Sequence, residues 1–329
     1  MSSFLRVLLA RRRRFRYSGS RVPCNLCGGE SFLVVGRRDR WLNPLINVMC
    51  RQCGLIFLDP MPTDEEINRY YERHYRIHYQ GAAEPTPVSI LRSMRNAEER
   101  LQMLAPVLKP GMRILDVGSG GGEFLATAQR QGYEVEGVEP NVGYARYAER
   151  TYGVKVHVAP FMQIDFGGRQ FDLITCNHVL EHMRNPLANL RRFHQLLVPG
   201  GNLHLLVPDM AEPHKTPIGL FHFGHLHGFT HETLVMMAAK GGFAPFDDTR
   251  RNTALLFRRL AGPDPNWFRF PEHATALAAY FRRRTMWRHI ASIGAYKRTA
   301  GRLRYLLGDY LTVWRSSDRT SDVTKAKSS

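Results

Sequence analysis

An alternation of short apolar segments with helical segments, beginning at Arg113, constrains the fold of this chain more than any other feature. A strand, a helix and a second strand in this order form a βαβ unit, so the alternation predicts a mostly parallel sheet with helices on both faces. The predicted strands span residues 113–117, 135–138, 155–158, 171–176 and 201–207, with helices between them such as 123–131 and 186–197. After a helix around 232–240, two strand-like runs, 243–247 and 254–260, predict a terminal antiparallel hairpin. We therefore expect an α/β fold with a doubly wound sheet.

The first predicted strand runs into a glycine-rich turn. Asp116 is followed by Gly118, Gly120 and Gly122, and the next helix opens at Glu123. Glycine lets the backbone approach a ligand where a side chain would collide. A dinucleotide-binding turn of the form G-x-G-x-x-G requires glycine at position 123, and a glutamate there would repel a pyrophosphate. The turn therefore favours S-adenosylmethionine, which carries a sulfonium cation and no phosphate.

Four motifs in the order of the chain resemble those of class I S-adenosylmethionine-dependent methyltransferases. They are Asp116-x-Gly118-x-Gly120-x-Gly122, then Gly137-Val-Glu139-Pro140, then the fourth-strand segment 171–182, and then Leu197-Val-Pro-Gly-Gly201 before the fifth strand. The resemblance covers about residues 101–262 and implies a Rossmann-like fold in which Glu139 binds the ribose hydroxyls. The cofactor-binding residues that it implies are Asp116, Gly118, Gly120, Gly122, Glu139 and Asn177.

Two C-x-x-C pairs, Cys24 with Cys27 and Cys50 with Cys53, precede this region, and a glycine follows each pair. Four thiolates can close a tetrahedral zinc site, and a metal with all four positions taken by protein is structural and not catalytic. Two disulfides or four ordinary buried cysteines are the alternatives, and an intracellular chain disfavours disulfides. Together with the catalytic domain, the pairs resemble the zinc ribbons of sugar and cell-envelope methyltransferases.

Histidines are the candidate bases for removing a proton from the methyl acceptor. His178 and His182 follow the fourth predicted strand, where they resemble the Glu-x-x-Glu-His of quinone O-methyltransferases with His178 in place of the leading acid. A second group comprises His222, His225, His227 and His231. It resembles the Tyr-x-Glu-His of deoxysugar C-methyltransferases, of which only His225 is retained. We expect the base among His225, His182 and His178, with structurally bonded imidazoles or a metal site as alternatives.

The chain divides by composition into six segments. We expect a basic arm over 1–21, a zinc ribbon over 22–60, a helical linker over 61–100, the methyltransferase domain over 101–262, basic helices over 263–314 and a disordered tail over 315–329. The linker contains a capping-box sequence at Thr63-Asp-Glu-Glu66, and Pro85 and Pro87 predict a hinge. Thr230 is expected to cap the late helix.

The net charge of +17 lies in the two ends of the chain. Residues 1–21 carry +7 and residues 250–329 carry +12, which leaves about −2 for the body between them. A nucleic-acid enzyme lines its cleft with positive charge, so a nearly neutral body argues against such a partner. The basic ends are interpreted either as solvated arms and packed helices or as peripheral contacts with an anionic membrane.

The chain contains no apolar run of the roughly 20 residues that span a bilayer, and its first apolar run is too short for a signal peptide. We expect a cytoplasmic or membrane-peripheral enzyme. It would methylate oxygen or carbon of a small molecule such as a sugar, a cell-envelope precursor or a secondary-metabolite precursor. An RNA methyltransferase that grips its substrate with ribbon and arms, and a non-enzymatic ribbon scaffold, are the alternatives.

Overall fold

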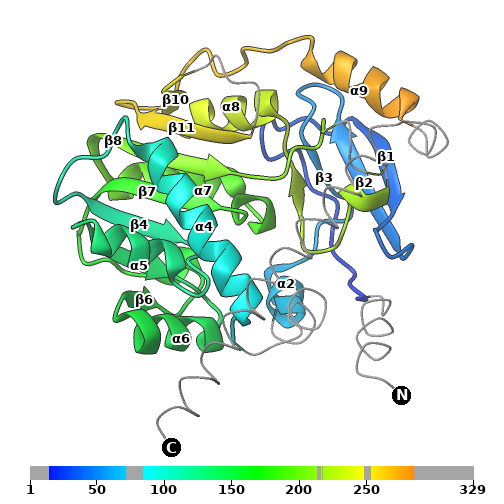
Figure 1. The fold of residues 1–329 in the computed structure, drawn as a ribbon. Coiled ribbons are helices and arrows are strands. Elements are labelled where there is room, and N and C mark those ends of the chain that lie inside the picture. The colour runs from blue at the N-terminus through cyan, green and yellow to red at the C-terminus, as the bar shows by residue number, and fades with distance from the viewer. Residues whose placement is uncertain (1–14, 72–83, 213–215, 217, 248–252, 285–329) are drawn as a thin grey trace, which may run out of the picture.

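The computed structural model describes residues 15–71, 84–212, 216, 218–247 and 253–284. Within them the larger sheet has seven strands in the order β10-β11-β8-β7-β4-β5-β6 (Figure 1). Its parallel strands are β4 (Arg113–Val117), β5 (Glu134–Val138), β6 (Lys155–His157), β7 (Phe171–Asn177) and β8 (Leu197–Leu206). The hairpin of β10 (Phe243–Pro245) and β11 (Ala254–Arg259) extends it in antiparallel fashion. The predicted α/β Rossmann-like sheet with its terminal hairpin is confirmed.

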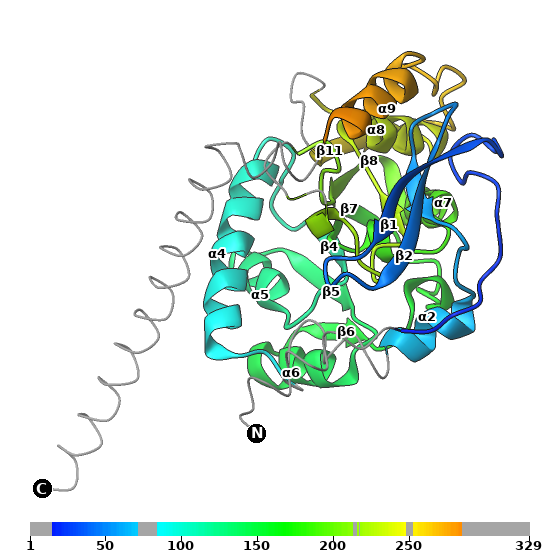
Figure 2. The same ribbon diagram turned by 90° about the vertical axis from the view of Figure 1, so that its right-hand side faces the viewer.

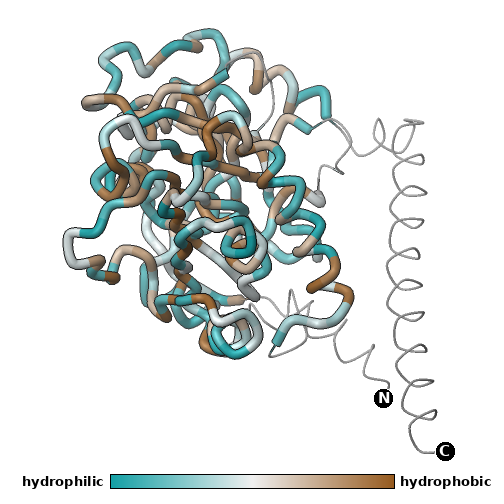
Figure 3. The backbone as a smooth tube through the Cα atoms, turned by 60° about the vertical axis from the view of Figure 1, so that its left-hand side comes forward, coloured by the Kyte–Doolittle hydropathy of each residue, from teal (hydrophilic) through white to brown (hydrophobic). Residues whose placement is uncertain are grey.

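Helices cover both faces of this sheet because successive side chains of each strand point to opposite sides. Ile114 and Leu173 pack under α4 (Pro87–Leu104) and α5 (Glu123–Arg130), whereas Leu115 and Ile174 join the larger core on the opposite face. That opposite face carries α7 (Pro186–Leu196) and α8 (His231–Lys240), and α6 (Val142–Tyr152) lies beside β6 (Figure 2). Hydrophobic segments gather in the interior of the molecule (Figure 3).

The predicted helix starts are confirmed by their caps. Thr63 forms a capping box with Glu66 at the start of α2 (Asp64–Tyr70), and Thr230 accepts a hydrogen bond from Thr233 N at the start of α8. Pro87 occupies the first turn of α4, where its missing N–H costs nothing. Residue 101 is the predicted boundary between the helical linker and the methyltransferase domain, and α4 runs through it without a break. Because α4 also packs on α5, this helix is one of those that cover the larger sheet.

A smaller sheet holds the ribbon. Its strands in the described residues are β1 (Phe32–Arg38), β2 (Pro44–Cys50), β3 (Ile56–Leu58) and β9 (His227–Gly228), all antiparallel. The fourth strand comes from the histidine-rich segment more than 160 residues later in the chain. In Figures 1 and 2 the smaller sheet lies beyond the carboxyl ends of β4 and β7. The ribbon is therefore joined to the catalytic region through a shared strand.

The end of the predicted basic arm is packed on the protein. Phe15 is buried against Tyr70 and Phe223, and the backbone N–H groups of Ser18 and Gly19 donate to Glu66. Aromatic side chains after the arginine run explain this docking, because they have apolar area to bury. Residues 1–14 lie outside the described residues.

Residues 285–329 also lie outside the described part, and with them most of the predicted basic helices and the predicted disordered tail. The part of the tail that the structure describes contains α9 (His273–Arg283). Among the described helices, none is both long and apolar enough to cross a bilayer.

Candidate functional site

The glycine turn between β4 and α5 has the backbone that its sequence predicts. Gly118, Gly120 and Gly122 have φ angles of 80°, 55° and 84°, a region that side chains disfavour. A Cβ on Gly118 would lie 2.1 Å from Val179, and one on Gly122 would lie 2.6 Å from Ala148. A Cβ on Gly120 would meet no atom within 4 Å, so this glycine borders open space at the carboxyl edge of the sheet. That edge is where open α/β sheets bind ligands.

Glu139 reaches the same turn from the end of β5. Its carboxylate accepts hydrogen bonds from Gly120 N (3.0 Å) and Asn141 N (2.8 Å). Two apolar side chains that the sequence analysis missed, Val158 and Met162, follow the neighbouring strand β6 and are 44% and 52% exposed. The turn therefore has a carboxylate on one side, and the two exposed apolar side chains follow the strand that pairs with β5.

Asp116 is buried beneath the turn. Its carboxylate accepts hydrogen bonds from Thr175 Oγ1 (2.5 Å) and from Arg100 (3.1 Å). Arg100 projects from α4 over the ring of Phe124, and burial lowers its pKa. The sequence analysis missed Arg100, although its signal was present: a lone arginine on the apolar helix face of Ala97 and Leu104.

Asn177, at the end of β7, belongs to the same buried network. With its amide oriented to suit its neighbours, its oxygen accepts from Arg100 and its nitrogen donates to His204 Nδ1 (2.9 Å). Burial lowers the pKa of His204 to about 3, which keeps that imidazole neutral. Arg100 thus holds the ends of β4 and β7 together behind the turn.

The position of Glu123 corrects one step of the sequence argument. A Cβ on Gly121 would lie 2.6 Å from the Glu123 carboxylate, which is therefore folded back against the turn and buried. Burial raises the pKa of Glu123 and so favours the neutral acid. A buried, neutral side chain would repel a pyrophosphate less than an exposed carboxylate would. Glutamate at position 123 therefore disfavours a dinucleotide less strongly than its sequence position suggests.

A carboxylate surrounded by histidines lies at the end of β7, where the chain forms a short helical turn, η3 (Leu180–His182). Glu181 is 1% exposed, and neither of its oxygens has a hydrogen-bond partner in the described part of the chain. His178 Nδ1, His182 Nε2 and His225 Nε2 lie 3.6, 3.7 and 3.8 Å from its Oε1. These are the three histidines named as candidate bases, and Glu181, on which they converge, is the second acid of the Glu-x-x-Glu-His resemblance and was not itself predicted as a site residue.

Two of these imidazoles direct their Nε2 atoms at Glu181. His182 Nδ1 lies 2.6 Å from the carbonyl oxygen of Gly224, which can only accept, so Nδ1 carries the hydrogen and Nε2 faces Glu181. Burial, with His222 and His182 nearby, holds the pKa of His225 well below its ordinary value. His178 is the most exposed of the three, with 58% of its side chain accessible.

The remaining histidines of the late segment differ in role. His222 packs against His225 with ring centroids 3.7 Å apart and is part of the cluster. His227 Nδ1 donates to the carbonyl of Met183 (3.1 Å), and burial lowers its pKa to about 4. His231 is buried in the first turn of α8, near Phe270. His227 and His231 therefore have structural surroundings.

The four ribbon cysteines converge as predicted. Cys24 Sγ lies 3.5 Å from Cys53 Sγ, and Cys27 Sγ lies 3.4 Å from Cys50 Sγ. A disulfide needs about 2.05 Å, whereas sulfurs about 2.3 Å from one tetrahedral zinc ion lie about 3.8 Å apart. All four sulfurs lie within 4.8 Å of one another, which fits a zinc ion. The oxygen and nitrogen atoms of Glu181, His182 and His225 form a second such group.

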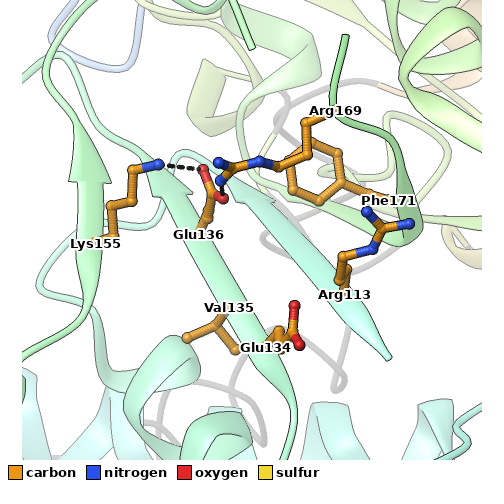
Figure 4. A pocket seen from close by; sticks show the side chains of 7 residues that line it. All are labelled: Arg113, Glu134, Val135, Glu136, Lys155, Arg169 and Phe171. Carbon is orange, nitrogen blue, oxygen red and sulfur yellow. Dashed lines mark ion pairs between the residues drawn. The ribbon is translucent and has the colours of Figure 1, made fainter. Parts of the chain in front are cut away.

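A cavity of about 430 Å³ lies at the opposite edge of the larger sheet (Figure 4). Glu136 in its wall pairs with Lys155 (3.2 Å) and with Arg169, so this carboxylate is engaged within the protein. Ligands of open α/β sheets bind at the carboxyl edge, and this cavity lies at the amino ends of the strands. The glycine turn and the histidine cluster remain the candidate site.

Comparisons with known proteins agree with this location. A family model described as a methyltransferase domain matches residues 90–246. A ubiquinone biosynthesis O-methyltransferase of Xanthomonas campestris is 38% identical over 107 residues, covering 31% of this chain and 45% of that protein. The enzyme of that name from Pseudomonas aeruginosa is 34% identical over 102 residues, covering 29% and 44%. The chain thus spans about half the length of the curated relatives it matches.

Solved structures that match the chain also include methyltransferases. An S-adenosylmethionine-dependent methyltransferase from Mesorhizobium loti is 19% identical, covers 50% of this chain and 98% of its own, and has a TM-score of 0.42. The 1,6-didemethyltoxoflavin-N1-methyltransferase of Burkholderia thailandensis is 22% identical, covers 60% and 86%, and has a TM-score of 0.42.

Proposed function

We propose that this chain, whose residues 90–246 match a methyltransferase domain, transfers a methyl group from S-adenosylmethionine to oxygen or carbon of a small molecule. We propose a sugar, another cell-envelope precursor or a secondary-metabolite precursor as the acceptor class. The observation that supports methyl transfer most strongly is the convergence of His182 Nε2 and His225 Nε2 on Glu181, at the same edge of the sheet as the glycine turn.

The residues at the turn fit S-adenosylmethionine, which would supply an electrophilic methyl group. Glu139 would hold the ribose hydroxyls, and the open side of Gly120 leaves room for backbone contact. Val158 and Met162 offer apolar area for the adenine ring. Asp116 and Asn177 would act mainly by fixing the turn, because Arg100 already binds both.

The histidine cluster would remove the acceptor's proton. During transfer of the methyl group to the acceptor atom, the acceptor's proton would be taken up at Nε2 of His225 or His182. Glu181, within 3.8 Å of both nitrogens, would stabilise the imidazolium that forms. Holding donor and acceptor in line supplies much of the remaining rate enhancement.

The ribbon cysteines would hold a structural zinc ion. All four coordination positions would be taken by protein sulfur, so the metal would have no open position for chemistry. The zinc ion would stabilise the fold of the ribbon. This fold includes β3, which pairs with β9 of the histidine segment.

Transfer of a labelled methyl group tests the proposed function. The protein is incubated with methyl-labelled S-adenosylmethionine and, separately, with nucleotide-activated sugars, phenols and transfer RNA. We expect label in one of the small-molecule classes and its loss in His225→Asn. Label that enters only RNA would overturn the assignment in favour of a nucleic-acid enzyme.

A further inference from the structure

The ribbon hairpin exposes apolar side chains on both of its strands and at its tip. Val34 on β1 and Ile46 on β2 are 41% and 39% exposed, and Leu42 at the tip of the hairpin is 55% exposed. Val48, the cross-strand partner of Val34, is buried, and the register of the two strands shifts between Val34 and the tip. The exposed side chains are therefore identified by their accessibility and not by a regular alternation along the strands.

The tip holds Leu42 outward in an unfavourable backbone conformation. Its φ angle is 69°, a region normally occupied by glycine or asparagine. The turn is closed by Asp39 Oδ1, which accepts hydrogen bonds from Trp41 N and Asn43 N, both at 2.8 Å. Leucine at this position carries both a conformational cost and a solvent-exposure cost, which a contact outside the protein would explain.

The charges around the tip are positive. Arg37 and Arg38 are exposed, whereas Asp39, the acid between residues 31 and 46, is buried. Arginines beside projecting aliphatic side chains complement the surface of an anionic bilayer, where the cations meet phosphates and the aliphatic groups enter the acyl boundary. A purely polyanionic partner would leave Leu42, Val34 and Ile46 without a role.

The hairpin also borders the histidine cluster. Arg40 N donates to the carbonyl of Phe221 (2.9 Å), and a Cβ on Gly36 would lie 2.6 Å from the Phe221 ring. Phe221 directly precedes His222, and the positive charge of Arg40 is one of the causes of the low pKa of His225. A surface that contacts the tip would therefore lie next to the candidate base.

We propose that the β1–β2 hairpin docks on an anionic lipid bilayer through Leu42, Val34, Ile46 and the adjacent arginines. In this arrangement the methyl acceptor is a lipid-linked or bilayer-dissolved molecule that reaches the histidine cluster from the membrane surface. The second statement rests on the proposed function, and the docking itself does not.

Sedimentation of the full chain with lipid vesicles tests the docking. Vesicles of phosphatidylcholine with about one third phosphatidylglycerol are compared with phosphatidylcholine alone, at physiological salt. The informative variant is Leu42→Asn, because asparagine tolerates the positive φ angle and the protein should be at least as stable as before. We expect Leu42→Asn to bind the anionic vesicles about tenfold more weakly, Arg37→Glu also to bind more weakly, and the unmutated chain to prefer the anionic vesicles.

The matched control is Phe246→Asn, since Phe246 is exposed to the same extent as Ile46 and follows edge strand β10. Equal vesicle binding by Leu42→Asn, Phe246→Asn and the unmutated chain would overturn the proposal and assign any binding to the basic ends. A change from dimer to monomer in Leu42→Asn without a change in vesicle binding would also overturn it, in favour of a second copy as the occupant.

The two proposals fail separately. Vesicle binding needs no methyl donor, so it can be lost while a soluble acceptor is still methylated, which would leave the proposed function intact. Conversely, binding that depends on Leu42 together with no methyl transfer to any acceptor would leave the docking intact and contradict the proposed function.

Discussion

At the scale of single residues, the site combines a buried acid with three imidazoles that converge on it. Glu181 has no hydrogen-bond partner in the described part of the chain, yet three ring nitrogens lie within 3.8 Å of its Oε1. A buried carboxylate without hydrogen bonds is costly, so this arrangement suits a proton acceptor that becomes charged during the reaction. The Glu181 carboxylate would stabilise the imidazolium that forms once a histidine has taken up the proton.

His225→Asn tests the role of the base. We expect kcat to fall by about 10² to 10⁴, the range for a lost general base, while the affinity for S-adenosylmethionine changes less than about twofold. Because the pKa of His225 is held below its ordinary value, activity of the unmutated enzyme should persist as the pH falls to 6. His194→Asn, which alters an imidazole bonded to the Leu260 carbonyl, is the control and should retain kcat. Equal kcat in both variants would remove His225 from the mechanism.

Buried neutral histidines also make stability depend on pH. Burial lowers the pKa of His204 to about 3 and of His227 to about 4, whereas an unfolded chain protonates histidine near pH 6.5. Below pH 6.5 the unfolded state therefore binds more protons, and the free energy of unfolding falls as the pH drops from 6.5 toward 4. Each histidine contributes a slope of about 1.4 kcal/mol per pH unit in this window.

Urea unfolding at pH 6 and pH 5 checks that contribution. The free energy of unfolding should be lower at pH 5 than at pH 6. In His204→Asn this drop in the free energy of unfolding should be smaller by about 1.4 kcal/mol than in the unmutated chain. An unchanged difference would mean that His204 is already charged in the folded protein.

At the scale of elements, the short strand β9 joins the ribbon to the site. Leu58 N donates to the Leu226 carbonyl (3.0 Å), and Phe57 and His227 are register partners. On its other side the histidine segment is tied to η3 by two crossing hydrogen bonds, from His182 to Gly224 O and from His227 to Met183 O. The position of His225 relative to Glu181 thus depends on both sheets.

Two substitutions of His227 separate positioning from stability. His227→Phe keeps the ring that faces Phe57 and loses the donor to Met183 O, so kcat should fall about tenfold or more because the cluster is misplaced. His227→Asn keeps a donor near the position of Nδ1 and should recover most of kcat. S-adenosylmethionine affinity should be unchanged in both. If the two variants lose kcat equally and in proportion to melting temperature, the role of His227 is only structural.

The elements differ in how well their sequences specify them. Alternation of apolar strands and capped helices predicted the larger sheet, because each of those elements has a repeating pattern and a local start signal. The two residues of β9 have no such pattern, and their pairing with β3 depends on the tertiary fold. Likewise, Glu181 and Arg100 are single polar residues in apolar segments, so their partners appear only when strands and helices are assembled.

At the scale of the whole molecule, the ribbon would make the acceptor side of the site dependent on metal. One zinc ion per chain is expected by elemental analysis, together with four thiols that react only after a chelator is added. Two disulfides per chain on thiol titration would contradict the zinc assignment.

Cys53→Ser should weaken zinc binding and loosen β3, which begins three residues later. We expect methyl transfer to fall at least about tenfold while binding of S-adenosylmethionine persists, because the turn and Glu139 lie in the larger sheet. Cys176→Ser, outside the ribbon, serves as the control. Loss of cofactor binding together with folding in Cys53→Ser would show instead that the two sheets unfold as one unit.

Calorimetric titration of the full chain with S-adenosylmethionine and with NAD tests which ligand the glycine turn binds. We expect S-adenosylmethionine to bind, NAD not to bind, and Glu139→Ala to weaken binding of the methyl donor about tenfold or more by removing the carboxylate beside Gly120. Binding of NAD at this turn, or binding of S-adenosylmethionine with the same affinity in Glu139→Ala, would contradict this expectation.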